Sequence, residues 1–144
     1  MIIVVDSNLL FSALVRISLT RKIIYELDED LVFPESIFDE LRRNKLELVK
    51  KSKLSEKEFD EILRLILKHV KIIPTENLKP YREEAFDLIR EHSPEDVMFI
   101  ACALAFDNGI IWSNDKKLKR QNKVRVLNTQ EIKDMIENNK QKTF

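Results

Sequence analysis

Short apolar runs recur along the chain, separated by longer stretches in which apolar residues repeat every three or four positions. The short runs have strand length and are bounded by turn or cap residues, which is typical of buried β-strands. We therefore predict five strands, at residues 2–5, 31–33, 71–73, 110–112 and 125–127.

The longer stretches predict helices between these strands. The clearest begins after Ser55, where six apolar residues at three- and four-residue steps form one stripe and Ser55 with Glu58 matches a capping box. Residues 97–106 are apolar all round, which indicates a buried central helix, and Asn108-Gly109 offers a left-handed stop. We expect Thr129 to cap a last helix. The predicted helical ranges are 9–15, 23–27, 35–51, 55–70, 82–91, 94–106 and 129–138.

Strands that alternate with helices imply parallel pairing through right-handed crossovers. The predicted fold is therefore α/β, with helices on both faces of a roughly five-stranded parallel sheet. No linker or repeat divides the chain, so we expect one domain over residues 1–138 and a frayed tail over 139–144. In such a sheet ligands gather beyond the carboxyl ends of the strands.

Composition narrows the class of protein. The 144 residues balance 25 Lys and Arg against 25 Asp and Glu, so any contact with nucleic acid must come from local patches. The single cysteine, Cys102, excludes an intramolecular disulfide, and its apolar surroundings predict an inert buried thiol. The start of the chain lacks the pattern of an export signal, and the longest apolar run is too short to cross a bilayer. These features predict a cytoplasmic protein without a membrane partner.

Acidic residues in separate segments suggest a shared site. Asp6 and Asp115 each follow a predicted strand, Glu40 lies on the helix after the second strand, and Asp96 opens the central helix. A cluster of carboxylates without paired Cys or His suits a hard divalent cation, and such cations commonly act on phosphate esters. We therefore predict Asp6, Glu40, Asp96 and Asp115 as catalytic and metal-binding residues.

Each acid also has a purely structural role open to it. Asp6 and Asp115 could cap the helices that follow them. Asp96 could be the third residue of a helix whose start is capped by Ser93. Glu40 could pair with the arginine three residues further along. It is less probable that all four acids, in this order along the chain, have only such structural roles than that any one of them does. The set as a whole therefore favours a shared site.

The segments that contain these acids resemble the motifs of a known family. They are VDSNLL at residues 5–10, EL with an arginine at 40–43, DVMFIACAL at 96–104 and SNDKKL at 113–118. Together, and in this order, they resemble the PIN domain, the fold of VapC-type toxin ribonucleases and related RNA-processing nucleases. The resemblance implies a five-stranded parallel sheet, Mg²⁺ or Mn²⁺, endoribonuclease activity that leaves a 5′-phosphate, a homodimer and a small antitoxin that occludes the groove. Trp112 is bulkier than the usual residue there, and the segment after Asp115 lacks an acid that some relatives have, which leaves one or two ions open.

Neighbouring polar residues extend the predicted site. Some could orient the carboxylates or a metal-bound water, or serve only in turns and caps: Ser7, Asn8, Ser113 and Asn114. A basic run beside Asp115 could contact RNA phosphates or remain a solvated face: Lys116, Lys117, Lys119 and Arg120. His69 and His92 lie away from the acids along the chain and are interpreted as surface residues.

Two other functions are compatible with parts of this pattern. A non-catalytic PIN-like module that binds RNA or a protein would share the fold, but it has no need to keep all the acids. A receiver-like phosphoacceptor domain is also a parallel α/β sheet, but it needs paired acids at the first strand, and Asp6 is flanked by Val5 and Ser7. Metal-dependent cleavage of single-stranded RNA distinguishes the nuclease from both.

Overall fold

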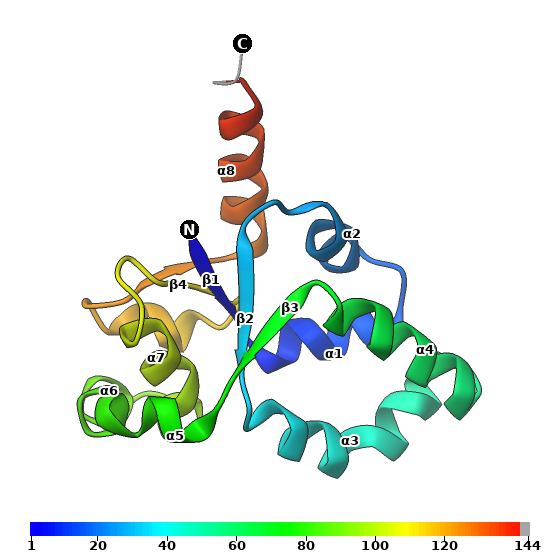
Figure 1. Cartoon of the computed structure of the whole chain (residues 1–144), viewed down its shortest axis with the longest axis horizontal. Coiled ribbons are helices and arrows are strands. Elements are labelled where there is room, and N and C mark those ends of the chain that lie inside the picture. Colours follow the sequence, from blue (N-terminus) through cyan, green and yellow to red (C-terminus); the bar gives the residue numbers. More distant parts are fainter. Residues whose placement is uncertain (142–144) are drawn as a thin grey trace.

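The structure, a computed structural model, describes residues 1–141. At its centre is a five-stranded sheet in which all neighbouring strands are parallel, in the order β3-β2-β1-β4-β5 (Figure 1). The strands are β1 (Ile2–Val5), β2 (Asp30–Pro34), β3 (Val70–Ile73), β4 (Ile110–Trp112) and β5 (Arg125–Leu127). Each predicted strand is present within one residue of its predicted bounds. The order places β1 between β2 and β4, so the switch point of the sheet lies at β1 and β4.

Helices and single turns of 3₁₀ helix connect the strands. They are α1 (Ser7–Val15), α2 (Leu19–Glu26), α3 (Ile37–Ser52), α4 (Glu56–Leu67), α5 (Thr75–Leu78), η1 (Lys79–Tyr81), α6 (Arg82–Ile89), η2 (Pro94–Asp96), α7 (Val97–Leu104), η3 (Lys116–Arg120) and α8 (Thr129–Gln141). The capping box of Ser55 and Glu58 is present at the start of α4. α2 begins earlier than the predicted residue 23 because the Ser18 hydroxyl accepts from the backbone N–H of Arg21.

The helices cover both faces of the sheet, which confirms the predicted three-layer architecture (Figure 1). Ile3 and Val5 of β1 pack into the core formed with α1 to α4 and α8, whereas Val4 between them packs against α6 and α7. This alternation is the ordinary period of a strand, and burial on both faces explains why the strands read as continuous apolar runs.

The central helix begins differently from its prediction. The sequence predicts an α-helix starting at Pro94, with Ser93 as its cap. The structure has one 3₁₀ turn, η2, followed by α7 from Val97. The Ser93 hydroxyl donates to the carboxylate of Asp96 and, at 3.2 Å, to that of Glu95, so it caps no backbone N–H. Ser93 therefore fixes the carboxylate of Asp96 and does not cap the helix.

The end of α7 requires close packing against β4. Asn108 adopts the left-handed conformation with φ of 60°, as a stop signal there predicts. A Cβ atom on Gly109 would lie only 2.5 Å from the carbonyl oxygen of Ala103, so this residue is glycine because the two backbones approach closely.

The last helix differs from its prediction at both ends. Its cap is Asn128, whose side chain accepts from Glu131 N–H at 2.8 Å while the Glu131 carboxylate accepts from Asn128 N–H at 3.1 Å. Thr129 is therefore the first helical residue, not the cap. The helix continues past 138 to Gln141, and the rest of the predicted tail, 142–144, lies outside the described residues. Within the part of the chain that the structure describes, no helix is long and apolar enough to span a membrane.

Candidate functional site

Asp6 lies at the point where β1 ends beside β4. Its backbone N–H donates to the carbonyl of Trp112 at 3.0 Å, which extends the β1–β4 pairing to the site. The carboxylate is almost fully buried and accepts a hydrogen bond of 2.6 Å from the Ser113 hydroxyl, with longer contacts of 3.5 Å from the Ser7 hydroxyl and Asn8 N–H. Asp6 caps α1, as one alternative predicted, and also points into the site.

Asp115 follows β4 and is joined to Asp6 through one buried hydroxyl. The Ser113 oxygen accepts from Asp115 N–H at 3.0 Å while its hydrogen is donated to Asp6. The Asp115 carboxylate accepts from Lys117 N–H at 2.9 Å and so caps η3. Ser113 therefore sets the position of two acidic residues at once.

Glu40 and Asp96 approach the same region from α3 and from η2, and both are partly buried. Burial raises the pKa of Glu40, the Ser7 hydroxyl and Arg43 oppose that rise, and the charge of Asp6 adds to it. The structure contains no ion pair between Glu40 and Arg43 among the described residues.

Asp96 has the most perturbed carboxyl of the site. Burial raises its pKa to about 6, the Ser93 hydroxyl opposes that rise, and the charges of Asp6, Glu95 and Asp115 add to it. Burial likewise raises the pKa of Asp6, with the charge of Asp115 contributing. The charge of Asp6 therefore acts on Glu40 and on Asp96, and the charge of Asp115 acts on Asp6 and on Asp96. Asp6, at the end of β1 beside β4, is the acid that lies near each of the other three.

The chemistry of this set fits a hard divalent cation. All four candidate donors are carboxylates, the ligands that such a cation prefers, and none forms an ion pair within residues 1–141. The side chains as they stand do not converge into a ligand shell, since no three His, Cys, Asp or Glu residues in the described chain are close enough to hold an ion together. Asp6, Glu40, Asp96 and Asp115 could hold a cation only after side-chain rotation towards it.

A second hydrogen-bond network supports the site from α8. The indole N–H of Trp112 donates to the Thr129 hydroxyl at 3.0 Å. The Asn114 side-chain oxygen accepts from the backbone N–H of Thr129 at 2.9 Å and from its hydroxyl at 3.1 Å. Asn114 thus holds the start of α8 and orients no carboxylate. Sequence reasoning missed Thr129 as part of the site, and the only signal was a polar residue two positions after a strand.

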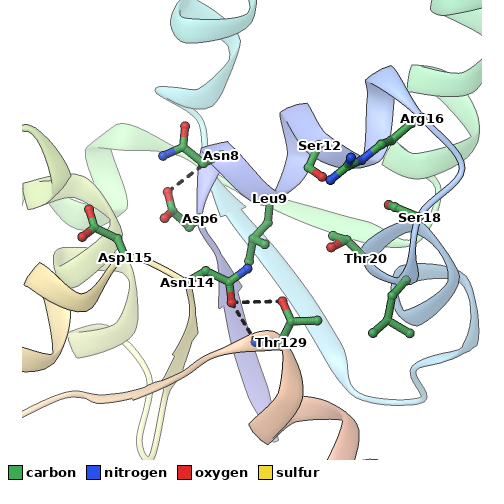
Figure 2. Close-up of a pocket in the computed structure, with 11 residues that line it drawn as sticks. Asp6, Asn8, Leu9, Ser12, Arg16, Ser18, Thr20, Asn114, Asp115 and Thr129 are labelled. Carbon is green, nitrogen blue, oxygen red and sulfur yellow. Dashed lines mark hydrogen bonds between the residues drawn. The ribbon is translucent and has the colours of Figure 1, made fainter.

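A groove of about 480 Å³ opens beside Asp6 and Asp115 (Figure 2). Asn8 and Leu9 of α1 line it, and Asn114 with Thr129 forms the facing wall. The Asn8 side chain is exposed to this space, whereas Ser7 and Ser113 are buried beneath it. The groove is the accessible route to the acids from this side.

The predicted RNA-binding residues form the exposed surface of η3, next to Asp115: Lys116, Lys117, Lys119 and Arg120. Lys119 forms an ion pair with Glu131, so part of this positive charge is already neutralised. The other three have no ion pair in the described chain and remain available for an anion.

The remaining reactive side chains lie outside the site. Cys102 is fully buried in α7, which confirms the predicted buried thiol, and burial raises the pKa of this thiol to about 12. His69 is exposed and contacts the ring of Tyr25, with 5.1 Å between ring centroids, and His92 is partly buried. Neither histidine contributes to the electrostatics of the acids.

Comparison with known proteins agrees with the fold. The family model described as PIN domain matches residues 4–137, whereas no protein of curated function matches significantly. Six chains of solved structures match, including one from the crystal structure of VapBC2 from Rickettsia felis bound to a DNA fragment from their promoter. That chain superposes with a TM-score of 0.68 at 18% identity, over 89% of this chain and 98% of its own length, which is a likeness of fold. Because the family match extends over nearly the whole sequence, this chain belongs to the PIN-domain family.

Proposed function

We propose that this protein is a Mg²⁺- or Mn²⁺-dependent endoribonuclease. The observation that carries the proposal is the place of Asp6 at the switch point of the sheet, where its charge is coupled to acids from three other segments. None of the four acids forms an ion pair within residues 1–141: Asp6, Glu40, Asp96 and Asp115. Acids that served only to cap separate helices would not need to lie where their charges interact.

The role of the four carboxylates would be to bind the metal ions beside the scissile phosphate. When bound, one or two divalent cations would supply an activated water and would offset charge on the phosphoryl group. Asp6 and Asp115 are pre-positioned for binding, because the Ser113 hydroxyl joins the side chain of one to the backbone of the other. Asp96 and Glu40 would complete the ligand set from the other two segments.

Basic residues beside the acids would bind the RNA backbone. Lys116, Lys117 and Arg120 are exposed on η3, and phosphate contacts of this kind position a nucleic acid without reading its sequence. Lys119 would contribute less, because Glu131 already binds its ammonium group.

The family resemblance supports a narrower proposal, in which this nuclease is the toxin of a toxin–antitoxin pair. The structural neighbour is a VapBC2 assembly, and by analogy we propose a small antitoxin as partner and a homodimer as the assembly. Co-expression with the product of an adjacent small open reading frame tests this partner. Recovery of an inactive complex that becomes active after removal of the small protein is the expected result.

The central test is cleavage of a mixed single-stranded RNA by the purified chain with Mn²⁺, Mg²⁺ or EDTA. We expect cleavage with either metal, none with EDTA, and none by Asp6→Asn. Asp107→Asn is the matched control, because Asp107 is exposed in the loop before β4, at the opposite edge of the sheet. Equal activity in EDTA, or a fully active Asp6→Asn, would refute the proposal. RNA binding with no cleavage under any metal would favour the non-catalytic module.

A further inference from the structure

The groove beside Asp6 continues along α1, away from the acids. Asn8 and Ser12 line it from one face of this helix, because they are four residues apart. Arg16, the extended residue that follows the helix, lines the groove beyond them. Figure 2 shows Arg16 at the end of the groove opposite Asp115. The groove therefore has an acidic end and a basic end joined by a polar wall.

Arg16 is the charged group at the basic end, and no partner within the described residues binds it. Its side chain is exposed and has no ion pair or hydrogen bond within residues 1–141. Arg21, close by in sequence, is used differently, because its Nε–H donates to the carbonyl of Ala13 at 2.7 Å and fastens α2 to the end of α1. Arg21 therefore connects α2 to α1, whereas Arg16 faces the groove.

The far end of the groove can bind a phosphate by more than one contact. The hydroxyl-bearing residues Ser18 and Thr20, at the start of α2, line the groove near Arg16. Guanidinium and hydroxyl groups are the side chains that most often contact phosphate oxygens. Leu9 and Leu19 add apolar lining, against which an unstacked base can pack.

We propose that Arg16 binds a backbone phosphate of the RNA strand whose scissile bond lies at the acids, and that the face of α1 with Asn8 and Ser12, which leads to Arg16, sets the path of that strand. This inference rests on the proposed function, since it concerns the same substrate. The nine residues of α1 separate Asp6 from Arg16, and at a rise of 1.5 Å per residue this places the contact about 15 Å from the acids. The bound phosphate therefore belongs to a nucleotide a few positions from the cleaved bond.

Arg16 also ends α1, where a basic residue stabilises the helix through its dipole. A purely structural role of this kind predicts a small loss of stability and no change in RNA affinity. The two roles are separated by measuring binding and thermal stability on the same variants.

The test is binding of a fluorescein-labelled single-stranded RNA of mixed sequence, measured by fluorescence anisotropy in the Asp6→Asn background. Non-specific phosphate binding does not depend on the base sequence, so the natural target is not needed. Arg16→Gln and Arg16→Lys are compared with Arg64→Gln. Arg64 is exposed, has no ion pair in the described residues, and lies in the last turn of α4, which leads to the opposite edge of the sheet.

Arg16→Gln is expected to raise Kd about fivefold to tenfold at low salt and to reduce the slope of log K against log salt by about 0.7, the value for one phosphate contact on a single strand. Arg16→Lys should retain most of the affinity, and Arg64→Gln should remain within about twofold of the parent. In a cleaving protein, Arg16→Gln should raise KM and leave kcat nearly unchanged.

Equal affinities of the Arg16→Gln and Arg64→Gln variants would overturn the proposal. The outcome for the nuclease itself is read separately from cleavage by the wild-type chain. If the wild-type chain cleaves RNA and Arg16→Gln binds RNA as tightly as the parent, only the role proposed for Arg16 is refuted. If binding depends on Arg16 but the wild-type chain cleaves no RNA, only the proposed nuclease activity is refuted.

Discussion

Replacement of Asp96 by asparagine should stabilise the metal-free protein. The pKa of this carboxyl rises from its ordinary 3.8 to about 6, so the ionised form is disfavoured in the folded state. At about 1.36 kcal/mol per pKa unit, the rise corresponds to about 3 kcal/mol as an upper limit. Because Asp96 is only partly buried, solvent screening reduces the expected effect to about 1 kcal/mol. Asparagine removes the charge and can still accept the hydrogen bond from Ser93.

The effect should depend on pH in a defined direction. Below about pH 4 the carboxyl is protonated in both states, so wild-type Asp96 causes no loss of stability. Between pH 4 and 6 the unfolded state ionises first, and the stability of the wild-type protein falls as pH rises through this window. Above pH 6 the loss is complete, so the advantage of Asp96→Asn is full near neutral pH and disappears towards pH 4.

The assay is thermal unfolding in EDTA across this pH range, followed by titration with Mg²⁺ or Mn²⁺. A change of about 1 kcal/mol corresponds to about 3–5 °C in Tm for a domain of this size. Metal should raise the Tm of the wild-type protein by mass action and should raise that of Asp96→Asn much less. Glu95→Gln, which removes the same charge from an exposed residue of the same turn, is the control and should leave the metal response intact.

An Asp96→Asn variant that is less stable than wild type in EDTA at neutral pH would refute this account of the site. A stability difference that stayed constant from pH 4 to 8 would refute the link to ionisation. An undiminished metal response would remove Asp96 from the ligand set.

Substitutions at three further positions test the supports of the site and the packing of α7 against the start of β4. Ser113→Ala should reduce the free energy of unfolding by about 1.5–3 kcal/mol in chemical denaturation, because the buried Asp6 carboxylate loses its shortest hydrogen bond; an unchanged midpoint would contradict this. Thr129→Val should shift the emission of Trp112, the only tryptophan, by leaving its indole N–H without an acceptor, and Thr129→Ser should restore it. Gly109→Ala should lower Tm by several degrees, since its Cβ would lie 2.5 Å from a carbonyl oxygen of α7; a Tm equal to wild type would show that the backbones can separate there.

The local features of the site were predictable from sequence because they depend on neighbours along the chain. Asp6 ends an apolar run and precedes a helix, so its place at the end of a strand follows from period and capping alone. The same reasoning failed at Ser93 and Thr129, where a competing side-chain hydrogen bond within a few residues decides which residue caps. Ser93 bonds the Asp96 carboxylate, and Asn128 takes the role predicted for Thr129.

The sequence by itself determined the strands, most helices, the α/β class and the identity of the four acids, because hydrophobic period and cap chemistry act over a few residues. Only the tertiary structure decided that β1 lies beside β4, and from this pairing follow the hydroxyl of Ser113 between two acids and the perturbed pKa of Asp96. It also decided that Arg16 faces the same groove as Asp6. Strand order depends on packing between segments far apart in sequence, and no local pattern encodes which of several compatible neighbours a strand will choose.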